Sequence, residues 1–140
     1  MINVGELILQ ASEARKMSYS PYSGFAVGAA LLCANGEIYQ GCNIESAAYS
    51  PTNCAERTAI FKAISEGDRK FIAIAIVGGK KEKMLGELEI CVPCGVCRQV
   101  MAEFCEADKF IIILAKDTEK YNIYKLQELL PLSFGADNLK

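Results

Sequence analysis

Three cysteines and one glutamate have the types and spacing of a metal-dependent hydrolytic site. Cys94 and Cys97 form a Cys-x-x-Cys pair after Pro93, and Cys54 precedes Glu56 by two residues. If both pairs lie at helix N-termini, the positive end of each helix dipole favours thiolate, and three thiolates can bind one zinc ion. Three protein ligands leave one tetrahedral position for water, which is typical of catalytic zinc.

The glutamate can reach such a site from the opposite face of its helix. Two helical steps rotate Glu56 by about 200° from Cys54. Helical side chains tilt toward the N-terminus, so a site beyond the end of the helix is accessible from both faces. We therefore predict that Glu56 reaches the same site as Cys54 and is not a solvated surface carboxylate.

The Cys-x-x-Cys pair alone leaves other interpretations open. A redox dithiol at a strand-to-helix junction has this spacing, and so does half of a structural zinc site, although a second Cys-x-x-Cys is missing. Cys91, Cys94 and Cys97 also begin an iron–sulfur pattern, but Met101 stands where the fourth cysteine belongs. The sequence contains no histidine, which excludes a Ser/His or Cys/His nucleophilic pair.

Composition fits one compact domain, which we expect to span residues 1–140. Fifteen Lys and Arg against 17 Asp and Glu give a net charge of −2, which does not suggest a nucleic-acid partner. The longest apolar runs cover residues 71–77 and 110–115, far short of the about 20 residues that a membrane helix needs. We therefore expect no membrane partner.

The expected location is cytoplasmic. The first residues lack the basic patch, long apolar stretch and cleavage site of a secretory signal. The seven cysteines are an odd number and do not read as the disulfide framework of a small secreted protein. Reduced thiols or metal ligands are the better interpretation.

Helical and strand patterns alternate along the chain. Periodicity and turn residues predict helices over residues 3–17, 51–66 and 94–105, strands over 25–33, 37–44, 71–77 and 110–115, a loop over 78–89, and a short strand or helix over 121–130. The first two strands form a hairpin around Asn35-Gly36. We expect an α/β fold with a mixed five-stranded sheet covered by helices in three layers, α/β/α.

The helix that follows Cys54 is predicted from its end signals. Ser50 is a suitable N-cap with Pro51 at the first helical position, and Gly67 is placed to end the helix. This placement puts Cys54 and Glu56 in the first two turns.

Taken together, the motifs resemble those of the zinc-dependent nucleoside and nucleotide deaminases. "CAERTAIFKA" at residues 54–63 and "PCGVCRQV" at residues 93–100 look like that family's C-x-E and P-C-x-x-C signatures. With cysteine in place of histidine at position 54, and with "FAVGAALL" and "GCNIESAAYS" upstream, the chain is similar to the small cytidine deaminases in particular. The resemblance covers nearly the whole chain.

This resemblance implies hydrolytic deamination of cytidine and deoxycytidine to uridine and deoxyuridine, with release of ammonia, in pyrimidine salvage. It implies a homotetramer with active sites at the subunit interfaces and one Zn²⁺ per subunit. The family's site residues match as follows: Cys54, Cys94 and Cys97 bind zinc, Glu56 is catalytic, Phe25 lines the pocket, Asn43 and Glu45 hold the ribose hydroxyls, and Ala47, Tyr49 and Phe134 approach a neighbouring subunit's nucleoside.

Three thiolates around a dication leave a net charge of −1, so the sulfurs need partners that withdraw charge. We predict that Arg57 and the exposed N–H groups at the two helix starts hydrogen-bond these thiolates.

Two other functions remain open. A deaminase of a cytosine nucleoside antibiotic such as blasticidin S uses the same zinc and glutamate chemistry, whereas a zinc-stapled interaction module binds zinc without an activated water. Asn43, Glu45 and Phe134 favour the plain nucleoside. A polynucleotide substrate is disfavoured because no basic, base-stacking surface is evident.

Overall fold

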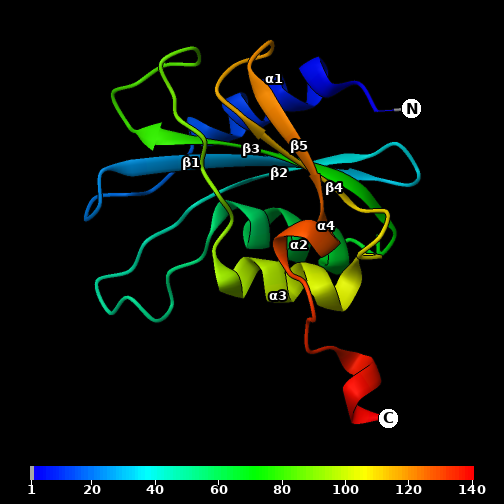
Figure 1. The fold of residues 1–140 in the computed structure, drawn as a ribbon. Helices are drawn as coiled ribbons and strands as arrows, with labels where there is room; N and C mark the ends of the chain where they lie inside the picture. The colour runs from blue at the N-terminus through cyan, green and yellow to red at the C-terminus, as the bar shows by residue number, and fades with distance from the viewer. Residues whose placement is uncertain (1) are drawn as a thin grey trace.

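A mixed five-stranded sheet forms the centre of the computed structural model, which describes residues 2–140. Its strands are β1 (Phe25–Cys33), β2 (Ile38–Cys42), β3 (Phe71–Lys80), β4 (Ile111–Ala115) and β5 (Tyr121–Lys125). They lie in the order β2-β1-β3-β4-β5 (Figure 1). Strands β3 and β4 are parallel, and the other neighbouring pairs are antiparallel. The predicted mixed sheet is confirmed.

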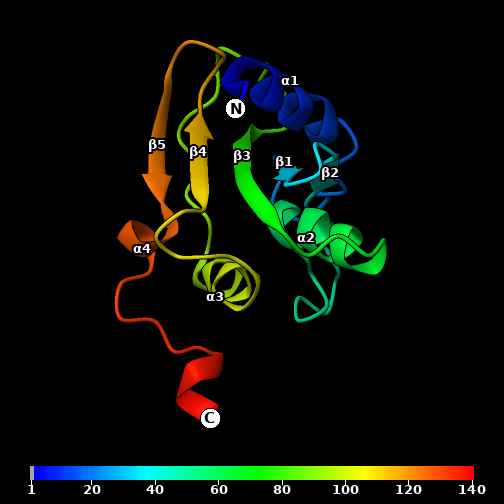
Figure 2. The same ribbon diagram turned by 90° about the vertical axis from the view of Figure 1, so that its right-hand side faces the viewer.

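Helices cover both faces of this sheet. The helices are α1 (Val4–Arg15), α2 (Ala55–Ser65), α3 (Gly95–Phe104), α4 (Leu126–Leu129) and the 3₁₀ turn η1 (Ala136–Leu139). Helix α1 lies on one face, and α2 and α3 lie on the other (Figures 1 and 2). Within residues 2–140, no helix is both long enough and apolar enough to cross a membrane.

Alternating side chains of the strands pack into two separate hydrophobic cores, one on each face of the sheet. Ala30, Ala75 and Ile113 pack with α1, whereas their chain neighbours Ile74 and Ile112 pack with α2 and α3. Both sets are fully buried. A central strand buried on both faces reads as a continuous apolar run, which is why β3 and β4 were recognisable as uninterrupted hydrophobic segments. The predicted three-layer arrangement is confirmed.

Helix α2 packs directly on β2 at Gly41. A Cβ atom at this position would lie 2.4 Å from the carbonyl oxygen of Ala55 and 2.5 Å from the backbone nitrogen of Ala59. Only glycine therefore allows the helix backbone to approach so closely. Because Ala55 directly follows Cys54, this contact also sets the position of Cys54 relative to the sheet.

Helix α2 begins later than the sequence signals predict, whereas α3 begins at Gly95, one residue after its predicted start. Cys54 is the N-cap of α2 and Cys94 is the N-cap of α3. The predicted helix start at Ser50 and Pro51 was wrong, because Ile44 and Asn53 pair in an antiparallel β-bridge that holds the preceding segment extended. Each N-cap cysteine lies at the end of its helix, where its side chain can face a site beyond that end.

Strand β3 is longer than predicted, and the predicted loop is shorter. Gly78 and Gly79 continue the strand and pair with Val27 and Ala26 of β1. The two glycines are typical of a turn. However, Gly78 lies against the Cys91 side chain, and a Cβ atom added to Gly78 would lie 2.9 Å from the Cys91 sulfur. Close packing, not a turn, explains its presence. The segment after Tyr121 contains both predicted alternatives, strand β5 followed by α4.

Candidate active site

The N-termini of α2 and α3 bring three cysteine sulfurs together. The Cys54 and Cys94 Sγ atoms are 3.6 Å apart, and those of Cys94 and Cys97 are 3.5 Å apart. All three sulfurs lie within 4.8 Å of one another. The Cys94 sulfur also accepts a hydrogen bond from the backbone N–H of Cys97, as an N-cap side chain does. Cysteines 40 residues apart in the chain therefore form one cluster.

These sulfurs fit a zinc ion. A tetrahedral zinc with Zn–S bonds of about 2.3 Å places its thiolates about 3.8 Å apart, close to the two observed separations. The cluster provides three protein ligands, Cys54, Cys94 and Cys97, so a four-coordinate ion retains one position for a non-protein ligand. That donor set is typical of catalytic zinc, whereas a structural site closes with a fourth protein atom.

The cluster favours thiolate even before metal binding. The pKa of Cys54 is lowered to about 5, with a hydrogen bond from Cys97 as the largest cause and the hydrogen bond from Arg57 as a further one. The hydrogen bond between the two thiols keeps the proton on Cys97 and raises the pKa of that thiol. A bound metal ion would displace this shared proton, since a coordinating thiol is deprotonated outright.

Arg57 is the cation that faces the cluster. Its Nη2 donates a hydrogen bond to the Cys54 sulfur at 3.2 Å. Burial alone lowers the pKa of Arg57, but hydrogen bonds to Cys54 and Cys97 outweigh burial and raise it. The Nε atom of Arg57 is buried without a hydrogen-bond partner in the described part of the chain. A buried donor without a partner costs free energy, which is consistent with a guanidinium held in place for its charge.

We expect Arg57→Ala to lower turnover by roughly 10- to 100-fold while the fold remains intact, because an outer hydrogen-bond partner of a metal ligand contributes on that scale. Steady-state rates, zinc content and circular dichroism measure the effect. Arg69→Ala is the matched control, since Arg69 is an exposed arginine at the end of the loop after α2. Unchanged rate and zinc content in Arg57→Ala would remove this role.

Glu56 lies within the first turn of α2 and is almost completely buried, with an exposed fraction of 4%. Burial raises its pKa to about 7. The carboxyl group lines a cavity of about 250 Å³ together with Cys54 and Cys94. A carboxyl that can be either protonated or ionised near neutral pH, next to a metal site, is suited to proton transfer.

The same cavity contains two of the predicted substrate-binding residues, Phe25 and Asn43. It is completed by residues that the sequence motifs did not identify: Val27, Thr52, Asn53, Ala55, Cys91 and Val92. For Cys91 and Val92, the sequence signal that could have placed them in the cavity wall was their position directly before the Pro-Cys motif. Val27 belongs to strand β1, and its place in the cavity wall is visible only in the folded structure.

Asn43 is held by the backbone of β1. Its Oδ1 accepts hydrogen bonds from the backbone N–H of Val27, at 2.9 Å, and from the Ser18 hydroxyl. Its Nδ2 donates to the carbonyl of Phe25 at 2.8 Å. Both acceptor sites of the amide oxygen are therefore used, and one N–H remains for a ligand.

Glu45 and Tyr49 line a neighbouring cavity of about 360 Å³, and Thr52 lines both cavities. The Glu45 carboxylate accepts hydrogen bonds from the Ser23 hydroxyl and from the backbone N–H groups of Tyr22 and Ser23. The Ser23 hydroxyl is the largest cause that lowers the pKa of Glu45. Glu45 therefore stays ionised and fixes the loop that leads into Phe25.

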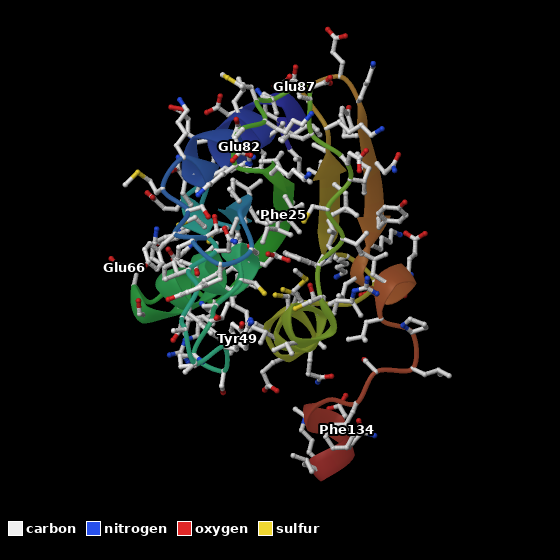
Figure 3. The ribbon with its side chains drawn as sticks, turned by 90° about the vertical axis from the view of Figure 1, so that its left-hand side faces the viewer. Phe25, Tyr49, Glu66, Glu82, Glu87 and Phe134 are labelled. Carbon is white, nitrogen blue, oxygen red and sulfur yellow. The ribbon has the colours of Figure 1, made fainter. Side chains whose placement is uncertain are left out.

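Two predicted substrate contacts lie outside these cavities. Ala47 is exposed and lines neither of them. Phe134 is 59% exposed on the C-terminal segment, and Figure 3 shows it well away from Phe25 and Tyr49. Within one subunit the structure thus joins Phe25, Asn43 and Glu56 to the cysteine cluster but leaves Phe134 apart.

Comparisons with known proteins agree with this geometry. A family model described as the cytidine and deoxycytidylate deaminase zinc-binding region matches residues 1–114. The cytidine deaminase of Sporosarcina psychrophila is 46% identical over 99% of this chain and 96% of its own length, and that of Halalkalibacterium halodurans is 47% identical over 95% of each. The crystal structure of cytidine deaminase from Burkholderia pseudomallei superposes with a TM-score of 0.84, at 40% identity, covering 96% of this chain and all of that one. The chain therefore belongs to the cytidine and deoxycytidylate deaminase family, with Cys54, Cys94 and Cys97 as its zinc ligands.

Proposed function

We propose that this protein catalyses the hydrolytic deamination of cytidine and deoxycytidine to uridine and deoxyuridine, with release of ammonia. One observation carries the proposal: the buried Glu56 carboxyl shares a cavity with the three-sulfur zinc site. Relatives of 46 and 47% identity that bear the name cytidine deaminase support it.

Zinc, when bound, supplies Lewis-acid activation and lowers the pKa of water from 15.7 toward about 7, so no histidine base is needed. The three cysteines hold the ion, and Arg57 neutralises part of their charge through its hydrogen bond to Cys54. Phe25, Val27 and Val92 give the cavity apolar walls.

Glu56 moves two protons in this reaction. It first accepts a proton from the water that adds to carbon 4 of cytosine and delivers it to ring nitrogen 3. It then moves the second proton of that water to the amine, whose bond to carbon 4 breaks as ammonia leaves. The carboxyl group returns to its starting state. A pKa of about 7 suits both directions of transfer.

Residues at the mouth of the cavity hold the nucleoside. Phe25, which is 40% exposed, offers a ring to the substrate, and the remaining N–H of Asn43 is available to a ribose hydroxyl. Glu45 is ionised and retains acceptor capacity for a second hydroxyl. The side chains of Asn43 and Glu45 are held in place by hydrogen bonds to backbone groups, which lowers the entropic cost of binding.

The proposal extends to a homotetramer in which Ala47, Tyr49 and Phe134 reach a neighbouring subunit's nucleoside. Tyr49 and Phe134 are 74% and 59% exposed, and aromatic residues are enriched at subunit interfaces. We also propose that residues 1–140 form a single domain and that the protein is cytoplasmic. The seven cysteines are all unpaired in the described residues, which supports a reducing compartment.

The test is to incubate the purified protein with cytidine and follow the loss of cytosine absorbance. We expect turnover that a chelator abolishes and added zinc restores. Blasticidin S is tested in parallel. Turnover of blasticidin S without turnover of cytidine or deoxycytidine would favour the antibiotic deaminase. A zinc-loaded protein that converts none of the three would favour the interaction module.

A further inference from the structure

Helix α3 begins at the zinc site and also holds the C-terminal segment, residues 130–140. The side chain of Gln99 donates a hydrogen bond from Nε2 to the carbonyl oxygen of Phe134 at 2.7 Å. Its neighbour Arg98 donates from Nη1 to the carbonyl oxygen of Leu129 at 2.6 Å. Two consecutive side chains of α3 therefore bind the main chain of the C-terminal part. Arg98 binds it at Leu129, the last residue of α4, and Gln99 binds it at Phe134.

Arg98 links this segment to the zinc site as well. Its Nε donates a hydrogen bond to the carbonyl oxygen of Pro93 at 2.8 Å, directly before the zinc ligand Cys94. The guanidinium group is planar and offers its donors in a fixed arrangement. One side chain thus fixes the end of α4 relative to a zinc ligand.

The backbone between the two anchor points is in an unfavourable conformation. Leu132 has a φ of 51°, in the left-handed region that residues with a side chain rarely adopt. Its side chain is fully exposed, so packing does not hold it in this conformation. Hydrogen bonds from Arg98 at Leu129 and from Gln99 at Phe134 lie on either side of this residue. The segment then projects away from the sheet (Figures 1 and 2).

We infer that Gln99 and Arg98 are positioning residues that hold the C-terminal segment so that the Phe134 ring is presented to a nucleoside. The inference rests on the proposed function, in which Phe134 contacts the substrate of a neighbouring subunit. Gln99 binds the main chain of Phe134, so it orients the segment without touching the substrate. Its effect on substrate binding therefore depends on the Phe134 side chain.

Steady-state kinetics with cytidine test this inference on the zinc-loaded protein. Gln99→Met keeps the length of the side chain but removes the N–H donor. We expect it to raise KM by about three- to tenfold, the scale of one lost hydrogen bond, and to leave kcat unchanged. Gln99→Lys restores a donor and should return KM toward the wild-type value. Glu103→Gln is the control, since Glu103 is exposed on the same helix.

A double-mutant cycle with Phe134→Ala decides how Gln99 acts. If Gln99 works through the aromatic ring, Gln99→Met should have no further effect on KM in the Phe134→Ala background. An unchanged KM for Gln99→Met, beside a raised KM for Phe134→Ala, would overturn the inference and leave the proposed function intact. A Phe134→Ala protein with the wild-type KM would instead refute the substrate contact of Phe134, and the inference with it.

Discussion

Glu56→Ala should lower the turnover of cytidine by at least about 100- to 10,000-fold, because general acid–base assistance alone contributes on that scale. The same carboxyl serves both proton transfers, so no remaining group in the cavity replaces it. Zinc should stay bound at one ion per subunit, since the ligands are the three cysteines. Steady-state kinetics and metal analysis of the same preparation measure both quantities.

A matched control for this variant is Glu66→Ala. Glu66 is the C-cap of α2, and Figure 3 shows it at the periphery of the molecule. Its replacement removes a carboxyl group from the other end of the same helix and should leave turnover near the wild-type value. Retention of substantial deaminase activity in the Glu56→Ala protein would contradict the assignment of the proton carrier.

The second large effect is expected from Cys54→Ser. A serine hydroxyl is a poor replacement for a thiolate ligand, and two thiols remain to hold the ion. The affinity for zinc should fall by more than the roughly 10- to 100-fold that loss of an outer hydrogen-bond partner costs. Turnover should fall to background at limiting zinc. Titration with a chromophoric zinc chelator gives the affinity without any measurement of activity.

Cys91→Ser is the matched control for metal binding. Cys91 lines the same cavity, but its sulfur is outside the three-sulfur group. Burial raises the pKa of Cys91 to about 12, so its thiol remains protonated. The variant should bind one zinc per subunit as tightly as the wild type. A Cys54→Ser protein that binds zinc equally well would show that the ion is held elsewhere.

The fold was largely predictable because its strands are chemically simple. Strands β3 and β4 are buried on both faces and carry uninterrupted apolar side chains, and Asn35-Gly36 provides the hairpin turn, with Gly36 at a φ of 92°. The start of α2 was not predictable from local signals. Ser50 and Pro51 satisfy the rules for a helix start, but the bridge between Ile44 and Asn53 is a long-range contact that overrides them.

The chemistry of the site was more predictable than its walls. Cys54, Glu56, Cys94 and Cys97 stand in two short motifs, and the predicted hydrogen bond from Arg57 to a thiolate is present. The cavity walls come from segments that meet only in the folded chain.

Asn43 shows the limit of motif-based prediction. Its motif suggested a ribose contact, but how much of its hydrogen-bonding capacity the backbone of β1 uses is visible only in the structure.

Zinc K-edge X-ray absorption of the purified protein tests the central claim most directly, because it counts the atoms around the ion. Three thiolates with one open position predict three sulfur scatterers at about 2.3 Å and one light oxygen or nitrogen scatterer at about 2.0 Å. The light scatterer should persist in the Glu56→Ala protein, since that carboxyl is not a ligand. Four sulfur scatterers, with Cys91 as the fourth, would contradict the account, because no position would then remain for the activated water.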